Sequence, residues 1–501
     1  MTKRAGALAV ATGILLSRLA GLVRERAFAH YLGNGPIAGI VRAAMRIPNL
    51  LQTLLGDGVI AGSFIPVYAR LLGAGREDDA ARVAGFVGAA VSLLGALLVA
   101  LGVTLAGPFV TLVSPGYTGG EHALTVELVR WLFLGTGMLV PAAWCLGVLN
   151  SHRRFFLPYV APVLWNAAQI VALVGFAAGK LPEDVARLLT WGLVVGSAAQ
   201  LLVQLPLALR LARPRAGWGA AAGEIRTVIS LFVPTLVGRG VVQISAYIDL
   251  SLATLLGSPA VSSIGYAQLL YLLPVSLFGT AISAAELPEM ARAAEQARER
   301  LAVARRRMIF FVAPTAVAFV ALGDVVVAAL FQTGRFGGDD ARIVWAILAA
   351  QAIGLVATTE GRLLASTLYA RGEAKVPLRG ALLRLSVSAG LGVAAVLWLP
   401  WDWQGRAMAL AGAGSLAAWA ERLFLGARLG GVPRDLGGDL RVWVAALAAA
   451  GAGFGLHSLF RFGHPLVEGA AILGLYGAVY LGVAAALGRG EARALLRGRR
   501  P

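Results

Sequence analysis

Charged side chains are scarce in this 501-residue sequence: Asp, Glu, Lys and Arg make up 14% of it, while 58% of the residues are hydrophobic. A soluble protein of this length needs far more polar residues to cover its surface. The apolar excess must therefore face lipid, and an integral membrane protein is expected. Little sequence is left for a folded aqueous domain, which excludes a soluble enzyme held by a membrane anchor.

Cysteine and histidine are almost absent. Cys145 is the only cysteine, which excludes a disulfide-stapled secreted domain. The five histidines stand singly near the ends of apolar runs, so we expect neither a metal site nor a catalytic histidine dyad. No cofactor is expected either, because glycine-rich phosphate loops need a strand and helix context that the sequence does not provide.

Acidic residues are also few, 26 against 44 Lys and Arg, which leaves a formal net charge of +18. In a soluble protein such an excess suggests nucleic-acid binding. In a protein that crosses the membrane many times, the same excess is expected from Lys and Arg in cytoplasmic loops. No nucleic-acid partner is therefore predicted.

The apolar runs predict an all-α fold with about fourteen transmembrane helices, at about 20 residues each. They lie at 6–29, 37–69, 83–107, 123–148, 157–178, 185–209, 226–250, 262–286, 308–331, 342–368, 377–399, 406–427, 439–459 and 466–488. The run 37–69 is too long for one perpendicular crossing, so we expect it to tilt or to extend past the lipid. The first run has no small-residue cleavage site and continues into Arg18, so it is interpreted as a span and not as a signal peptide.

Basic residues alternate from loop to loop, and this predicts orientation because Lys and Arg resist translocation. One set of connecting segments, which includes both chain ends, 292–307, 371–379 and 422–441, holds most of the 44 Lys and Arg residues. The alternate set holds few, among them Lys180 and Arg335. Fourteen spans with both termini in the cytoplasm keep every basic loop on one side.

Three pairs of segments resemble one another at an offset near 220 residues, which equals six predicted spans. SFIPVYARL at 63–71 matches AELPEMARA at 285–293, LNSHRRFFLP at 149–158 matches LYARGEAKVP at 368–377, and SRLAGLV at 17–23 matches GRGVVQI at 238–244. An even number of spans preserves orientation, so these are parallel repeats. The predicted architecture is two pseudo-symmetric six-helix lobes, 1–222 and 223–428, then spans 13 and 14 within 429–488 and a basic cytoplasmic tail at 489–501.

Several arginines lie inside the predicted spans, where each costs about 2.5–3.5 kcal/mol at a helix centre. They are Arg18, Arg24, Arg26, Arg42, Arg46, Arg130, Arg239, Arg362 and Arg384. At this cost they should line protein or water. Those on the first two helices of each lobe would meet at a central cleft, where Glu25, Asp57 and Asp249 are the nearby counter-charges. Such a cleft should attract an anion, and phosphate or pyrophosphate suits the bidentate arginine fork.

A structural role is the competing interpretation of these arginines. We favour snorkelling to the interface or ion pairing for Arg26, Arg42, Arg362 and Arg384, and for Arg130, which has Glu127 one turn away. For Arg46 we favour neither the structural role nor anion binding over the other. Arg18 lies about twelve residues into its span, and there a function is favoured.

Two N-terminal segments, SRLAGLVRERAFAHYLGNG at 17–35 and RIPNLLQTLLGDGVIAGSFIPVYARL at 46–71, resemble the start of the MurJ (MviN) lipid II flippases of bacteria. GYAQLLYLLPVSLFGTAISAAELPEMAR at 265–292 and LYARGEAKVPLRGAL at 368–382 resemble that family's later signatures. The resemblance covers nearly the whole chain to about residue 488. It implies the multidrug/oligosaccharidyl-lipid/polysaccharide exporter fold, with an alternating-access cavity and a lipid-tail groove formed by spans 13 and 14.

The resemblance implies a flippase, not an enzyme, in the bacterial cytoplasmic membrane. Its substrate would be the undecaprenyl-pyrophosphate-linked precursor of peptidoglycan, lipid II, moved to the outer leaflet with energy from a coupling ion or the membrane potential. A flippase for another polyprenyl-linked glycan is the alternative. A membrane-embedded transferase is disfavoured, because the short periplasmic loops leave little room for a general base or nucleophile.

The resemblance also implies site residues. Arg18 and Arg24 match two cavity arginines that are important in the family. This chain has Gly39 where the family usually has an acidic residue, and it has Gln52 and Gln268 where the family has arginines. Arg42, Arg46 or Arg239 would substitute for the missing charges. The predicted substrate-binding set is Arg18, Arg24, Arg46, Gln52, Arg239 and Gln268.

Because the basic loops alternate, a reporter enzyme that is active only in the periplasm should give no signal when fused after Pro501. The same reporter inserted beside Lys180, in the weakly basic set, is the matched control and should be active. Strong activity at Pro501 would mean an odd number of spans and would contradict the repeat as well.

Overall fold

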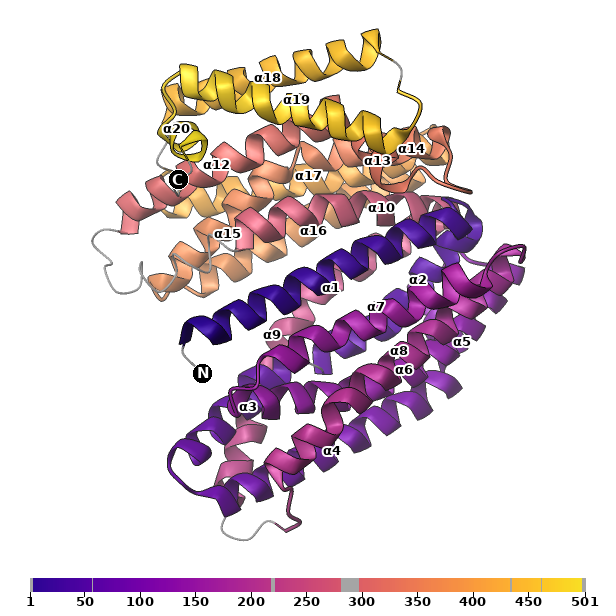
Figure 1. Ribbon diagram of the computed structural model, residues 1–501, viewed down its shortest axis with the longest axis vertical. Helices are drawn as coiled ribbons and strands as arrows, with labels where there is room; N and C mark the ends of the chain where they lie inside the picture. Colours follow the sequence, from indigo (N-terminus) through magenta and orange to yellow (C-terminus); the bar gives the residue numbers. More distant parts are fainter. Residues whose placement is uncertain are drawn as a thin grey trace. The chain divides into compact units, whose positions relative to one another are not determined.

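The computed structural model describes residues 3–55, 57–217, 221–280, 297–432, 435–460 and 462–497. Within these ranges, the side chains at 3–11, 50–55, 57–58, 61, 233–234, 237–246, 280 and 297–298 are not described. The elements of the described residues are helices, apart from an isolated bridge between Thr333 and Phe336 (Figure 1). The all-α prediction is confirmed.

The chain divides into two compact units, Met1–Ser258 and Pro259–Pro501. The helices of the first unit are α1 Lys3–Leu32, α2 Pro36–Leu55, α3 Asp57–Gly73, α4 Glu77–Thr104, α5 Ala106–Val113, α6 Gly119–Ser151, α7 Phe156–Phe176, α8 Pro182–Ala212 and α9 Ala222–Leu255. Helix α9 is tied to this unit by Glu224, whose carboxylate accepts hydrogen bonds from Arg70 at 2.7 Å and from Arg76 at 3.0 Å. The lobe boundary at 222/223, inferred from the repeat, lies one helix earlier and stays a prediction.

The second unit begins with α10 Ser258–Pro274, which continues as the π-helix η2 Val275–Thr280. It goes on with α12 Ala297–Ala321, α13 Gly323–Phe331, α14 Gly338–Ala352, α15 Leu355–Ala370, α16 Lys375–Leu397, α17 Trp403–Arg428, α18 Leu436–Leu459, α19 Pro465–Ala486 and α20 Gly490–Leu496. Helices α18 and α19 are the predicted spans 13 and 14, and α18 packs on α12 (Figure 1). The repeat segment 285–293 lies outside the described residues.

Among the described residues, eight helices are long and apolar enough to cross a membrane, or up to ten if each of two bent pairs is one span. Helices α1, α9 and α17 are also long, at 30, 34 and 26 residues. Each of the fourteen predicted spans overlaps at least one of the observed helices. The predicted span 37–69 corresponds to α2 and α3, which are described on either side of residue 56, and its tilt or extension past the lipid stays a prediction.

Two predicted spans are each divided into two helices. At both breaks, side chains of neighbouring helices donate hydrogen bonds to the backbone carbonyls. Helices α14 and α15 meet at 41° around Gly354. There Ser415 of α17 donates its hydroxyl to the Ala350 carbonyl at 2.7 Å, and the indole N–H of Trp419 donates to the Ile353 carbonyl at 3.0 Å. These bonds replace intrahelical ones, which is what a kink requires.

The break between α12 and α13 is sharper, at 83°. The indole N–H of Trp345 donates to the Val320 carbonyl at 3.1 Å. A Cβ atom at Gly323 would collide with the Trp345 ring, so only glycine lets the ring approach the turn. The predicted span 308–331 therefore ends at Ala321 and changes direction.

The turn after α6 repeats after α15. Arg154 N–H donates to the Leu149 carbonyl at 2.8 Å, and Glu373 N–H donates to the Leu368 carbonyl at 2.9 Å. The residue before each donor is left-handed, with φ of 58° at Arg153 and 76° at Gly372. The turns after α3, α17 and α19 close in the same way, with Gly75, Gly430 and Gly488 at positive φ. The conformation is therefore a common helix ending, and the internal repeat of 149–158 and 368–377 stays a prediction.

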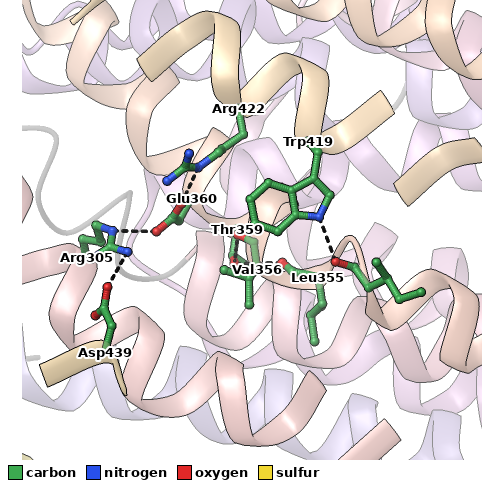
Figure 2. Close-up of polar contacts among 9 residues, drawn as sticks. Arg305, Leu355, Val356, Thr359, Glu360, Trp419, Arg422 and Asp439 are labelled. Atoms are coloured by element: carbon green, nitrogen blue, oxygen red, sulfur yellow. Dashed lines mark hydrogen bonds and ion pairs between the residues drawn. The ribbon is translucent and has the colours of Figure 1, made fainter. Parts of the chain in front are cut away.

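The core of the second unit holds a buried charge network (Figure 2). Glu360 of α15 is 2% exposed and accepts from Arg305 of α12 and from Arg422 of α17, both at 2.6 Å. Arg305 also donates to Asp439 of α18 at 2.8 Å. The sequence places Arg305 and Arg422 in basic cytoplasmic segments, whereas the structure shows that both are buried and tie four helices together.

Replacing Glu360→Gln leaves two buried guanidinium groups without their shared carboxylate. Breaking a buried ion pair in this way should lower the free energy of unfolding by about 3–5 kcal/mol. Thermal unfolding of the purified protein in detergent measures the loss. The control is Glu373→Gln, an exposed glutamate in the turn before α16, which should leave the midpoint unchanged; equal midpoints for the two variants would show that the network is not stabilising.

Candidate substrate site

The predicted arginines of α1 and α2 meet at one carboxylate. Glu25 is buried, and its Oε1 accepts a hydrogen bond from Arg24 at 2.6 Å while its Oε2 accepts one from Arg42 at 3.0 Å. The Arg24 and Arg42 side chains are each 16% exposed. Two guanidiniums therefore share this one carboxylate. Arg42 is thus ion-paired, as the structural interpretation of this residue predicts.

Aromatic rings hold both guanidiniums in place. The Arg24 guanidinium lies 5.1 Å from the ring centre of Trp165 on α7, and the Arg42 guanidinium lies 4.7 Å from that of Phe28 on α1. Contacts of this kind are worth about 0.5–2 kcal/mol, more when they are desolvated. These contacts and Glu25 therefore fix the orientation of both guanidiniums.

Trp165 also lines a cavity of about 70 Å³ inside the first unit, together with residues of α2, α6 and α8. Its indole Nε1 is buried and has no hydrogen-bond partner among the described residues. A polar group of this kind needs an acceptor, and a cavity of this size admits a water molecule. The sequence did not indicate Trp165, because only the fold brings α7 against α1.

Arg18 and Arg46 extend the basic cluster along the two helices. Arg18 is exposed and precedes Glu25 by seven residues, so both lie on one face of α1 about 10 Å apart along its axis. Arg46 is exposed and lies one turn after Arg42, and its carbonyl accepts a hydrogen bond from Tyr247 of α9 at 2.8 Å. The four arginines therefore follow two adjoining helix faces.

For the other three predicted site residues, the structure describes no contact with the Glu25 cluster. Gln52 and Arg239 lie in α2 and α9, but their side chains are outside the described part of the structure. Gln268 lies on α10 in the second unit, where its Oε1 accepts from Gln351 of α14 at 3.4 Å. In the described residues, no group of three or more His, Cys, Asp or Glu is arranged to hold a metal ion.

The missing acidic residue at position 39 has a steric explanation. A Cβ atom on Gly39 would collide with the backbone of Ser258, so α2 can approach this point only with glycine. An aspartate or glutamate cannot stand here without moving α2. The loss of the family's charge is therefore linked to helix packing.

The expected pairing of Arg130 with Glu127 is wrong. Glu127 of α6 accepts instead from Arg187 of α8, at 3.0 and 3.1 Å. The pairing of Arg384, in contrast, is confirmed, since it donates to Glu421 of α17 at 3.1 Å. Spacing along one helix cannot decide between a local partner and one on a neighbouring helix.

Comparison with solved structures defines the class of protein. The fold matches an inward-facing multidrug resistance MATE transporter of the MOP superfamily with a TM-score of 0.66 and 17% identity, over 85% of this chain and 98% of that one. It matches the lipid II flippase MurJ in its inward closed conformation with a TM-score of 0.80 and 20% identity, over 98% and 100%. The chain therefore has the fold of these two polytopic membrane proteins.

Sequence comparison narrows the class to a family. The family model of the lipid II flippase MurJ matches residues 28–459. A probable lipid II flippase MurJ of Rhizobium tropici is 30% identical over 77% of this chain and 74% of its own length, and the lipid II flippase MurJ of Burkholderia cenocepacia is 30% identical over 88% and 87%. The chain belongs to the MurJ family of lipid II flippases, which are transporters of peptidoglycan biosynthesis and not enzymes. The predicted family is confirmed.

Because position 39 has no room for a Cβ atom, Gly39→Ala and Gly39→Asp should both destabilise the protein. Overpacking of this kind costs about 1–3 kcal/mol or more, and the thermal midpoint and membrane abundance measure it. Gly35→Ala is the control, since nothing lies within 4 Å of a Cβ atom at that position. A stable Gly39→Ala variant would show that glycine is not required by packing.

Proposed function

We propose that the chain moves lipid II from the inner to the outer leaflet of the cytoplasmic membrane by alternating access. The single observation that carries the site assignment is the cluster in which Glu25 is shared by Arg24 and Arg42. The diphosphate binds at these guanidiniums, the sugar-peptide head crosses in a hydrated cleft, and the polyprenyl tail stays in lipid. The cycle draws on a coupling ion or on the membrane potential.

Glu25 has two roles in this proposal. In the empty site it neutralises part of the buried positive charge, which limits the cost of holding arginines inside the membrane. During transport it competes with the diphosphate for the same guanidinium N–H groups, because a carboxylate and a phosphate both accept the bidentate fork. The anion is therefore held while the cleft closes and is released when Glu25 recovers its hydrogen bonds.

The remaining predicted residues are assigned roles from their positions on the helices. Arg18 and Arg46 continue the basic faces of α1 and α2 and guide the diphosphate to the cluster. Gln52 and Arg239, on α2 and α9 of the first unit, contribute to the same path, and Gln268 stays a sequence prediction. The orientation proposed from the basic loops places both termini in the cytoplasm, and the predicted spans 13 and 14, helices α18 and α19, form the groove for the lipid tail.

Complementation tests the transport function. Expression of the chain in a flippase-depleted bacterium should restore growth, with lipid II accessible at the outer leaflet. Growth without accessible lipid II would point to another polyprenyl-linked glycan, and failure by a well-expressed chain would contradict the proposal.

In the same assay, Arg24→Ala and Arg18→Ala should each abolish flipping while membrane abundance stays near normal. Arg24→Lys should restore only part of the activity, because a lysine is a point charge without the planar fork. Arg130→Ala is the control, an exposed arginine of α6 outside the cluster, and should flip normally. If abundance and activity fall together in the Arg24 and Arg18 variants, their role is structural.

A further inference from the structure

A second basic region lies in the second unit, far along the chain from the cluster on α1 and α2. Three basic segments that are distant in sequence converge there: the start of α12, the start of α18 and the link from α19 to α20. They enclose a cavity of about 410 Å³, called here the C-terminal basic cavity. Its charged lining consists of Arg306, Arg307, Arg441, Arg489, Asp435 and Glu491.

Positive charge exceeds negative charge in this lining. Glu491 is shared by Arg306 at 3.0 Å and Arg489 at 3.2 Å, and Asp435 lies 3.6 Å from Arg489. Within the described residues the structure gives Arg307 and Arg441 no carboxylate partner. Four guanidiniums against two carboxylates give the described lining a net positive charge, which favours an anion.

Arg489 carries the strongest indication of a ligand. The residue is 4% exposed, and its Nε is buried with no hydrogen-bond partner among the described residues. A buried, charged N–H group without an acceptor is rare in native proteins, and it marks a place for a water molecule, an ion or a ligand. The surrounding net positive charge favours an anion over water.

The backbone is shaped to bring the guanidiniums together. Gly488 has a φ of 86° and ends α19, and the Arg489 N–H that follows donates to the Ala484 carbonyl at 2.9 Å. A Cβ atom at Gly438 would collide with the Arg489 guanidinium, and one at Gly488 would lie 3.7 Å from Arg441 Nη1. Glycine at 438 therefore makes the close approach of Arg489 possible, whereas the contact at 3.7 Å is an ordinary one and glycine at 488 is favoured by its positive φ.

The position along the helices indicates the depth of the cavity in the membrane. Arg306 and Arg307 stand directly before the apolar part of α12, Arg441 stands before that of α18, and Arg489 follows the end of α19. Basic residues at span ends lie at the level of the lipid headgroups, where arginine attracts anionic lipid. The cavity volume suits a small anionic group, since ligand pockets measure about 300–1,000 Å³.

We propose that the C-terminal basic cavity binds a phosphate group, and that the headgroup of an anionic phospholipid in the adjoining leaflet supplies it. The site shares no residue with the substrate cluster on α1 and α2. Arg441 and Arg307, which have no carboxylate partner among the described residues, bind the phosphate oxygens, and Arg489 contributes its Nε–H. The bound phosphate links α12 to α18 and α20.

The test uses the full chain in nanodiscs. Thermal midpoints are compared in phosphatidylcholine alone, in phosphatidylcholine with phosphatidylglycerol, and in phosphatidylcholine with inorganic phosphate. Phosphatidylglycerol should raise the midpoint of the unaltered chain. A rise with inorganic phosphate alone would keep the phosphate site but assign it to the free anion, and no rise with either would overturn the proposal without any variant.

Native mass spectrometry of retained lipid then locates the site. The double variant Arg307→Gln with Arg441→Gln removes the two arginines that hold no ion pair with a described carboxylate, so its fold should be kept. It should weaken phosphatidylglycerol retention by about tenfold or more. Arg371→Gln with Arg379→Gln, two exposed arginines near the start of α16, is the charge-matched control and should retain the lipid. Equal losses in the two double variants would show a general charge effect and would overturn the assignment to this cavity.

Discussion

One carboxylate shared by two guanidiniums is the interaction on which this protein depends. In the described part of the chain it occurs at Glu25, Glu224, Glu360 and Glu491. It follows from composition, since 44 basic residues face 26 acidic ones in a chain that must bury much of itself in lipid. A buried arginine needs a counter-charge, and at Glu25 and Glu360 one carboxylate provides it for two arginines.

The number of carboxylates in a cluster separates a structural role from a binding role. Around Glu360 a second acid, Asp439, brings the network to two positive and two negative charges, and the side chains of Arg305 and Arg422 are 8% and 7% exposed. A balanced, closed network can fix helices but has nothing left for a ligand. Around Glu25 the two paired arginines are more exposed, each at 16%, so this cluster is less closed than the network around Glu360.

The sequence was sufficient for the helices, the family and the arginines of the cluster, because hydropathy and the cost of burying charge act on each segment separately. It could not predict partners. Whether Glu127 pairs with Arg130 or Arg187, and that Trp165 lies against Arg24, depend on which helices pack together. The helix breaks could not be predicted for the same reason, since side chains of neighbouring helices satisfy the carbonyls there.

Helices α18 and α19 are bound to α12 by hydrogen bonds to one of its backbone carbonyls and from one of its arginines. Pro314 has no N–H, so the Phe310 carbonyl one turn earlier loses its helical donor. Tyr480 of α19 supplies that donor through its hydroxyl at 2.5 Å, and Asp439 of α18 accepts from Arg305, in the first half of α12, at 2.8 Å. Polar bonds at two levels of α12 therefore hold α18 and α19 in register with it. A movement of α12 would therefore be transmitted to these two helices through the same bonds.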